Sequence, residues 1–445
     1  MKITVFGAGY VGLVTAICLA DIGHQVVCID NNRNKIEQLI EGIPPIFEEG
    51  LQALLTKHLE TKNINFTSDP VEAILHGEII MIAVGTPLKN DDINLSYLYE
   101  VANTIVEHLN HDVIIVMKST VPPGTTKAIE KHITDLLWQR KFNCAVDFAV
   151  NPEFLQEGTA IRQFMHPDRI IVGADKISAI QTLHDLYSPI IKNKEQFLIM
   201  DKASAELTKY ASNALLATKI SFINEISQIA EKVDADIDAV KIGMGMDYRI
   251  NPLFLRAGCG FGGSCFPKDI MTLIATAKKL DINPYVLEAV IKRNNSQQKL
   301  LFHKVKNFFK NHLKNKTIAL WGLSFKPHTD DIRCATSHVL TELFWQEDCF
   351  IKAYDPLAME NFSQCYPNHP QLELCSSPFD ALENADVLVI ATEWPEFKQI
   401  PLNEIKQYLR YKAVFDGRNI FHPEEARRHN LHYYGVGRVA EAEGV

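Results

Sequence analysis

The stretch Lys2-Ile-Thr-Val-Phe-Gly-Ala-Gly-Tyr-Val-Gly12 decides the fold of the first part of the chain. Residues 2–6 are a short apolar run rich in β-branched side chains, which predicts a strand, and a helical pattern follows at residues 13–20. Between them stands G-x-G-x-x-G, the turn that aims a helix N-terminus at a pyrophosphate. The strand, turn and helix together predict a dinucleotide-binding domain.

An acidic residue follows at the expected distance. The apolar run at residues 25–29 ends in Asp30, 18 positions after Gly12. A carboxylate there can accept hydrogen bonds from an adenosine ribose and disfavours a 2′-phosphate, so NAD is favoured over NADP. Arg33 and Lys35 are close enough to leave NADP open.

Composition limits the class of protein. A chain of 445 residues with 47% hydrophobic and 22% charged residues predicts a globular protein of two or three domains. Its net charge of −9 gives no basic patch, so we expect no nucleic-acid partner. Nine scattered cysteines without a CxxC pair predict a reducing compartment and no zinc site. The apolar run at residues 3–20 is better explained by the dinucleotide turn than by a signal peptide or membrane span. We therefore expect a cytoplasmic protein without a membrane or metal partner.

Polar residues follow several predicted strands. Strands at 79–84 and 113–117 lead into Thr86 and Thr120, at the sheet edge where α/β proteins bind ligands. Ordinary turn chemistry would explain the neighbouring glycines and prolines equally well. After a strand near residue 148, Glu153 and Glu157 are four apart, which predicts one face of a helical turn. A solvated helix start would also carry such acids.

A long helix is predicted next. Residues 201–242 contain neither Gly nor Pro and show apolar residues at helical spacing. A helix of about 30 residues would span roughly 45 Å and suits a connector between domains or a dimer surface. Lys209 and Asn213 share a face of it; the alternative is a pair of exposed polar side chains.

The glycine-rich stretch Gly258-Cys-Gly-Phe-Gly-Gly-Ser-Cys-Phe-Pro-Lys-Asp269 presents a candidate nucleophile. Pro267 fits the first turn of a helix, which puts Cys265 just before a helix N-terminus with Lys268 nearby. Both features favour a thiolate. The alternative is a buried structural cysteine in a tight turn.

A second α/β half follows a helical stretch at 284–313. Residues 316–325 repeat the pattern of an opening strand and turn, and strands are predicted at 387–391 and 413–415. Only Gly322 remains of the glycine motif, so we expect this half of the chain to resemble a nucleotide-binding domain but to hold no second dinucleotide.

Nearly the whole chain resembles the UDP-glucose dehydrogenase family of nucleotide-sugar 6-dehydrogenases. The resemblance rests on GAGYVG at 7–12, VGTP at 84–87, STVPPGT at 119–125, NPEFLQEG at 151–158, GFGGSCFPKD at 260–269, GLSFKPHTDDIR at 322–333, YDP at 354–356, TEWPEF at 392–397 and DGRN at 416–419. It implies an α/β fold of two Rossmann-like, doubly wound parallel-sheet domains joined by a long central helix, a homodimer, and an active site between domains. The corresponding boundaries are 1–200 for the NAD-binding domain, 201–300 for the central helical region and 301–445 for the UDP-sugar-binding domain.

The resemblance also implies a reaction: NAD-dependent twofold oxidation of UDP-glucose at C6 to UDP-glucuronate. Cys265 would form a thiohemiacetal and then a thioester. Asp269 and a water near Thr120 would be the base, Lys209 with Asn213 would stabilise the oxyanion, and Glu153 would activate water for hydrolysis.

The implied binding residues fall into two sets. For NAD they are Gly7, Gly9, Tyr10, Val11, Gly12, Asp30, Lys35, Thr86, Thr120, Glu157, Lys268 and Arg333. For the UDP-sugar they are Glu153, Phe154, Leu155, Gln156, Lys209, Asn213, Arg249, Phe254, Leu255, Gly258, Gly262 and Lys326, with Arg249 reaching across a subunit boundary.

Two local strings depart from the family pattern, and two rival functions stay open. Glu48-Glu-Gly-Leu51 stands where EPGL is usual, and Cys334-Ala-Thr follows Arg333 in place of an acidic-apolar continuation. A sibling enzyme would act on GDP-mannose or a UDP-N-acetylhexosamine. A catalytically silent nucleotide-sugar sensor would keep the fold, and loss of Cys265 would be its simplest sign.

Overall fold

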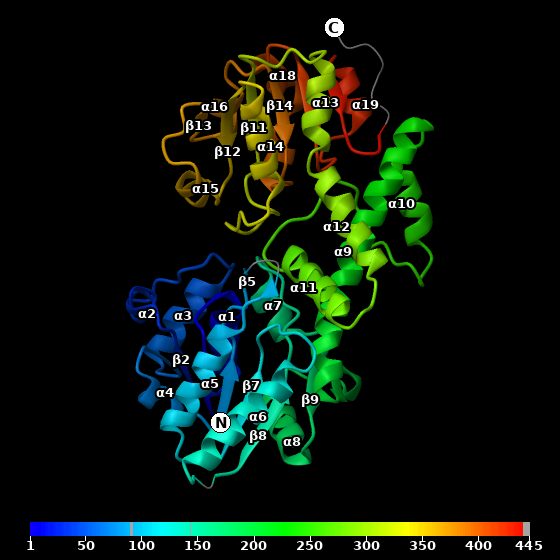
Figure 1. Ribbon diagram of the computed structural model, residues 1–445. Coiled ribbons are helices and arrows are strands. Elements are labelled where there is room, and N and C mark those ends of the chain that lie inside the picture. Colours follow the sequence, from blue (N-terminus) through cyan, green and yellow to red (C-terminus); the bar gives the residue numbers. More distant parts are fainter. Residues whose placement is uncertain (90–91, 143, 439–445) are drawn as a thin grey trace. The chain divides into compact units, whose positions relative to one another are not determined.

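The computed structural model describes residues 1–89, 92–142 and 144–438 (Figure 1). These residues form two compact units. The first unit comprises Met1–Ser212 with Met271–Lys279, and the second comprises Asn213–Ile270 with the chain from Leu280 onward. The division falls inside two continuous helices, α9 (Lys202–Lys232) and α11 (Phe266–Lys279).

The first unit is built on an eight-stranded sheet of order β10-β9-β8-β7-β4-β1-β2-β3. Its strands are β1 (Lys2–Phe6), β2 (Gln25–Ile29), β3 (Ile64–Thr67), β4 (Ile79–Ile82), β7 (Val113–Met117), β8 (Val146–Val150), β9 (Ile170–Ala174) and β10 (Phe197–Met200). All neighbouring pairs are parallel except β8 and β9. The predicted strands at 2–6, 25–29 and 113–117 are confirmed, and the one predicted at 79–84 ends at Ile82. Strand β4 is buried along its whole length, which explains its uninterrupted apolar sequence.

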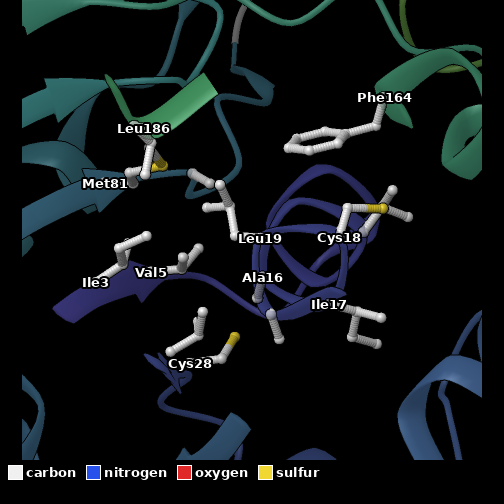
Figure 2. Packing of buried hydrophobic residues seen from close by; sticks show 14 of the residues in the cluster. Ile3, Val5, Ala16, Ile17, Cys18, Leu19, Cys28, Met81, Phe164 and Leu186 are labelled. Atoms are coloured by element: carbon white, nitrogen blue, oxygen red, sulfur yellow. The ribbon is translucent and has the colours of Figure 1, made fainter. Parts of the chain in front are cut away.

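Helices of the first unit pack on both faces of this sheet. They are α1 (Tyr10–Asp21), α2 (Arg33–Ile40), α3 (Leu51–Glu60), α4 (Pro70–His76), α5 (Ser96–His108), α6 (Thr125–Gln139), α7 (Ala160–Met165) and α8 (Ile177–Tyr187), with a short 3₁₀ turn at Lys194–Gln196 and a hairpin of β5 (Leu88–Lys89) and β6 (Asp92–Ile93). Figure 2 shows Ala16, Ile17 and Leu19 of α1 packed among side chains of the sheet, including Ile3 and Val5. Residues 12–20 are all buried, so α1 is covered on every side. This burial explains why the opening helix carries no charge before its last residue.

Helix α9 has 31 residues and confirms the predicted long helix. It ends at Lys232, where the chain turns. Asp234 adopts a left-handed φ of 55°, and the side chain of Asp236 caps α10 (Ile237–Gly245) by accepting the Asp238 N–H at 2.9 Å. Such a local cap competes with helix continuation.

The second unit carries a six-stranded, fully parallel sheet of order β13-β12-β11-β14-β15-β16. Its strands are β11 (Thr317–Trp321), β12 (Phe350–Tyr354), β13 (Leu372–Leu374), β14 (Val387–Ile390), β15 (Ala413–Asp416) and β16 (His432–Tyr434). Its further helices are α12 (Tyr285–Gln297), α13 (Leu300–Phe308), α14 (Thr336–Gln346), α15 (Met359–Cys365), α16 (Pro378–Leu382), α17 (Pro395–Gln399), α18 (Leu402–Tyr408) and α19 (Pro423–Arg428). The helical stretch predicted at 284–313 is therefore two helices, α12 and α13.

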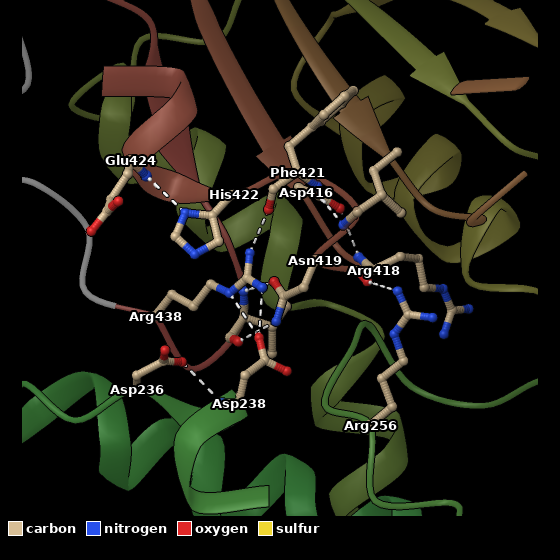
Figure 3. Close-up of polar contacts among 12 residues, drawn as sticks. Asp236, Asp238, Arg256, Asp416, Arg418, Asn419, Phe421, His422, Glu424 and Arg438 are labelled. Carbon is tan, nitrogen blue, oxygen red and sulfur yellow. Dashed lines mark hydrogen bonds and ion pairs between the residues drawn. The ribbon is translucent and has the colours of Figure 1, made fainter. Parts of the chain in front are cut away.

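Polar contacts tie the end of the described chain to the helical part of this unit (Figure 3). Arg438 donates to Asp238 of α10 at 2.6 Å and to the carbonyl of Phe421 at 2.6 Å. The N–H of Ile237 donates to the carbonyl of Gly437 at 3.0 Å. The sheet and α10 of the second unit are thus held together by the last described residues.

The predicted fold class is confirmed, with one addition. Both sheets are doubly wound around a central first strand, β1 in one and β11 in the other. The antiparallel β8–β9 pair extends the first sheet beyond a purely parallel arrangement. Among the described helices, none combines the length and apolar character that crossing a membrane requires.

Candidate active site

The glycine turn after β1 keeps the start of α1 open. A Cβ on Gly12 would lie 1.8 Å from the carbonyl oxygen of Gly7, so only glycine lets the helix approach the turn. Gly7 itself has a φ of 102°. Gly9, the N-cap of α1, has nothing within 4 Å of its Cβ direction, and the first turn of α1 carries no acidic residue. This leaves space and unpaired first-turn N–H groups for an anion, as a dinucleotide pyrophosphate requires.

Asp30, at the end of β2, braces the same turn. Its Oδ2 accepts the N–H of Ala8 at 2.8 Å and the ammonium of Lys35 at 3.3 Å. The loops after β4 and β7 are also joined, because the Thr86 hydroxyl donates to the carbonyl of Thr120 at 2.9 Å. Gly7, Gly9 and Gly12 and the predicted residues Asp30, Lys35, Thr86 and Thr120 thus follow the carboxyl ends of strands in the first unit, an arrangement that fits a dinucleotide. Lys268 and Arg333, also predicted for NAD, belong to the second unit.

A buried ion pair lies beyond β8. Glu153 Oε1 is 2.9 Å from Lys209 Nζ, and the two side chains are only 5% and 4% exposed. The alternative of an exposed polar residue is therefore wrong for Lys209. Burial alone would raise the pKa of the Glu153 carboxyl, but the charge and hydrogen bond of Lys209 outweigh it, so that pKa is lowered.

The helical turn predicted to carry Glu153 and Glu157 is not formed. Residues 151–156 have no helical structure. Pro152 has no N–H, and the carboxylate of Glu153 accepts the N–H of Leu155 at 2.6 Å in place of a helical carbonyl. The segment is held from outside: the N–H of Gln156 donates to a side-chain oxygen of Gln163 at 2.7 Å.

Aromatic contacts hold Phe154 in the same segment. The Arg169 guanidinium lies 3.9 Å from the centroid of the Phe154 ring, and Lys209 Nζ lies 5.4 Å from it. Both are cation–π distances.

Lys118 is a buried charge near this pair that the sequence reasoning missed. Its Nζ is 3.0 Å from Asn151 Oδ1, which also accepts the hydroxyl of Tyr187 at 2.6 Å. Burial lowers the pKa of Lys118 to about 8, while the Glu153 carboxylate acts in the opposite direction. The sequence signal for a buried charge was that Lys118 directly follows a fully apolar strand. A lysine at that place could equally be an ordinary exposed turn residue.

The second unit holds the predicted nucleophile beside a buried carboxylate. Cys265 immediately precedes α11, as predicted, and its carbonyl accepts the N–H of Asp269 at 2.8 Å. The amide of Asn213 donates to Asp269 Oδ2 at 2.6 Å, and Lys268 Nζ donates to Asp269 Oδ1 at 2.6 Å. Both Asn213 and Asp269 are buried, so the exposed alternative is wrong for Asn213 too. Ser264 Oγ lies 3.6 Å from Cys265 Sγ.

The glycines before Cys265 serve close packing of the loop. A Cβ on Gly262 would lie 2.4 Å from the carbonyl oxygen of Cys334, and Gly263 has a φ of 84°. The N–H of Gly258 donates to Asn224 of α9 at 2.8 Å. Backbone approach by residue 334 therefore accounts for Gly262, and the unusual Cys334 contributes only its main chain to this contact.

Other predicted residues of the second unit have different settings. Arg249 and Arg333 are exposed, and each is bound in a bidentate manner to the acid two residues before it. The Phe254 ring lies 6.3 Å from that of Phe266, Leu255 is buried, and Lys326 Nζ lies 5.6 Å from the Phe325 ring.

The second α/β half differs from the first where a dinucleotide would bind. Asp355 follows β12 as Asp30 follows β2, but it is buried and its Oδ2 accepts the N–H groups of Leu323 and Ser324 and the indole N–H of Trp394. That oxygen is saturated and cannot serve a ribose. Helix α14 begins only at Thr336, so no helix N-terminus directly follows the turn at residue 322. This geometry supports the prediction that the half holds no second dinucleotide.

Comparison with known proteins places the chain in a family. Sequence models of the UDP-glucose/GDP-mannose dehydrogenase family match it in three consecutive parts: the NAD binding domain at residues 1–191, the central domain at 203–296 and the UDP binding domain at 319–423. The chain belongs to this family. The predicted resemblance and the NAD cofactor are thereby confirmed, and the UDP binding domain supports a UDP-sugar as substrate.

Similar proteins cover the chain almost completely. It is 42% identical over 442 residues to the UDP-glucose 6-dehydrogenase of Pseudomonas aeruginosa, covering 98% of each chain. It is 44% identical over 441 residues to the UDP-glucose 6-dehydrogenase YwqF of Bacillus subtilis, covering 99% of this chain and 98% of that one. The solved structure of a UDP-glucose dehydrogenase from Pyrobaculum islandicum matches with a TM-score of 0.90 at 32% identity, covering 99% and 98% of the two chains.

Proposed function

We propose that this protein oxidises C6 of UDP-glucose from a primary alcohol to a carboxylate, giving UDP-glucuronate and reducing two NAD⁺. The observation that carries the proposal is the placement of Cys265 at the start of α11, one helical turn before the buried Asn213–Asp269 contact. Similarity over nearly the full length to proteins named UDP-glucose 6-dehydrogenase supports the choice of sugar.

The overall reaction consumes one water and releases three protons. NAD⁺ supplies the hydride acceptor in both oxidations. In the first, the C6 alcohol loses a hydride and its hydroxyl proton and becomes an aldehyde. The Cys265 thiolate then adds to the aldehyde carbon, and the resulting thiohemiacetal loses the second hydride to give a thioester. Water cleaves the carbon–sulfur bond, which releases the carboxylate and restores Cys265.

The surrounding residues have distinct proposed roles. Asp269, with a water near Thr120, takes up protons from the reacting oxygen. Asn213 and Lys209, one helical turn apart on α9, stabilise the oxyanion that develops when sulfur adds and when water attacks. Glu153 is kept ionised by Lys209 and activates the water that hydrolyses the thioester.

A substrate comparison tests the proposed sugar. NADH formation is measured with purified protein and UDP-glucose, UDP-N-acetylmannosamine or GDP-mannose under identical conditions. We expect the highest kcat/KM with UDP-glucose. A strong preference for either other sugar nucleotide would refute this choice and favour a sibling activity.

Replacement of the nucleophile tests the covalent route. Cys265→Ser should abolish steady NADH production, because a serine hydroxyl does not form the thioester. Cys365→Ser changes an exposed thiol on α15 and should leave the rate unchanged. Steady NADH production unaffected by Cys265→Ser would contradict the covalent mechanism. Wild-type protein that forms no NADH from any of the three sugar nucleotides would favour the silent-sensor alternative.

The proposed assembly is a homodimer. Leu215, Phe222 and Ile229 of α9 are 63%, 47% and 54% exposed and recur every seven residues, so they form one apolar stripe. A second copy of the stripe would cover it by a twofold contact. Light scattering should give twice the chain mass, and Phe222→Glu should reduce the measured mass to that of one chain.

We also propose a cytoplasmic location, since none of the nine cysteines forms a disulfide in the structure. Cell fractionation tests this location.

A further inference from the structure

Glu48 is a buried carboxylate at which three segments of the first unit meet. It lies just before α3, in the string that departs from the family pattern. Its Oε2 accepts the Tyr10 hydroxyl in a short hydrogen bond and the N–H of Gly158 at 2.6 Å. Its Oε1 accepts the N–H of Ala160 at 2.7 Å. The Tyr10 hydroxyl also accepts the Gly158 N–H at 2.9 Å.

Both carboxyl oxygens of Glu48 act as acceptors in these contacts, and the Tyr10 hydroxyl acts as a donor to one of them. Burial and the hydrogen bond to Glu48 raise the pKa of Tyr10 well above its ordinary value, so its hydroxyl keeps the proton that it donates. Hydrogen bonds to a charged acceptor are about twice as strong as neutral ones. Gly50, with a φ of 84°, forms the turn that brings Glu48 back to the start of α3. The carboxylate therefore joins the start of α1 to residues 158–160 of the same unit.

The junction connects the two predicted ligand-binding segments. Tyr10 is the first residue of α1 and follows Gly9 in the dinucleotide turn. Gly158 ends the segment 151–158, which carries Glu153 and has neither helix nor strand in its first six residues. The position of that segment therefore depends on side-chain anchors, with Lys209 at Glu153 and Glu48 at Gly158.

We propose that Glu48 is a positioning residue that couples the dinucleotide turn to the Glu153 segment, so that NAD and the UDP-sugar each bind more tightly when the other is present. The ligand identities rest on the proposed function. The physical reason is that one ligand orders both segments through the shared carboxylate, and the second ligand then meets a segment that is already ordered. Such coupling is reciprocal for the two ligands.

Direct binding measurements test the coupling. NADH and UDP-glucose do not react with each other, so calorimetry can give the Kd of NADH alone and with saturating UDP-glucose, and the Kd of UDP-glucose with and without NADH. We expect each ligand to tighten the other at least about fivefold in the wild type. We define the ratio as the Kd of one ligand alone divided by its Kd with the other ligand present. In Glu48→Gln this ratio should fall towards one, because the new amide NH₂ is itself a donor and would face the N–H and O–H donors that Glu48 accepts.

Two variants make the test specific. Glu49→Gln changes the exposed neighbour in the same string and should keep the wild-type ratio. Tyr10→Phe removes one donor and leaves the backbone contacts of Glu48, so it should fold and show an intermediate ratio. If thermal melting shows that Glu48→Gln does not fold, Tyr10→Phe decides.

The outcomes separate this inference from the proposed function. A wild-type ratio of one, or an unchanged ratio in Tyr10→Phe and in a folded Glu48→Gln, overturns the role of Glu48 while NADH formation from UDP-glucose stands. Wild-type protein that neither binds UDP-glucose nor forms NADH from it overturns both.

Discussion

Lys209→Met would remove the only ammonium within ion-pair distance of Glu153 among the described residues. A methionine side chain occupies much of the volume of the lysine methylene chain, so the substitution mainly removes the charge. At 2.9 Å the pair gains about 6 kcal/mol of Coulomb energy with an effective dielectric constant near 20. Removing one member of a buried pair typically costs about 3–5 kcal/mol. Because Lys118 and the Leu155 N–H still face the carboxylate, we expect about 3 kcal/mol.

Urea unfolding with circular dichroism measures this loss, and Glu153→Gln/Lys209→Met is the matched control. The double variant removes both charges of the pair and leaves only Lys118 as a buried charge nearby, so it should recover part of the stability lost in Lys209→Met. The pH dependence gives a second check. The folded pKa of Glu153 is lowered, so its stabilising contribution is present above the unfolded value of about 4.3 and is lost as the pH falls through the folded value. In Lys209→Met the loss of stability at low pH that comes from Glu153 should be smaller.

Two results would refute this reasoning. One is a loss below about 1 kcal/mol in Lys209→Met, which is the range of an exposed pair. The other is a double variant as unstable as Lys209→Met, which would assign the loss to packing of the lysine stem rather than to charge.

Four further substitutions address the cofactor turn and the buried lysine. Gly12→Ala should abolish NADH binding in a fluorescence titration and lower the melting temperature, because its Cβ would lie 1.8 Å from the Gly7 oxygen. Gly9→Ala has free space around its Cβ and should weaken NADH binding at an unchanged melting temperature. An equal fall in melting temperature in both variants would contradict this difference between the two glycines. Asp30→Ala should reduce the ratio of kcat/KM for NAD over NADP, and an unchanged ratio would remove Asp30 from the ribose. Burial lowers the pKa of Lys118 to about 8 in the folded state, below the unfolded value of about 10.4. The free energy of unfolding of the wild type should therefore rise by up to about 3 kcal/mol as the pH increases between these values. Lys118→Met should lack this rise, and an equal rise in the variant would show that another group titrates.

The dinucleotide turn could be predicted from the sequence because its determinants are local. Gly7, Gly9 and Gly12 lie within six residues of one another, and strand, turn and helix periodicities are short-range properties of the chain. The same holds for Cys265, whose place before α11 follows from the glycines before it and Pro267 after it. Recognition of the family likewise required only consecutive strings.

Where local chemistry competed with periodicity, prediction failed. The spacing of Glu153 and Glu157 suits a helical turn, but Pro152 and the bond from Leu155 N–H to the Glu153 carboxylate favour an irregular segment. The helix of about 30 residues predicted within 201–242 was by contrast confirmed, and the Asp236 cap starts a separate helix after it. In the Glu153 segment a carboxylate accepts a backbone N–H that a helical carbonyl would otherwise have accepted.

The sequence by itself determined the glycine turn after the first strand, the place of Cys265 just before a helix, and the family. Only the tertiary structure decided which polar groups are buried together: Glu153 with Lys209, Asp269 with Asn213, and Glu48 with the Tyr10 hydroxyl. These partners are 56, 56 and 38 positions apart, and no short-range pattern connects them. Their pairing depends on how strands and helices pack, because a carboxylate removed from water must find its donors wherever the fold brings them.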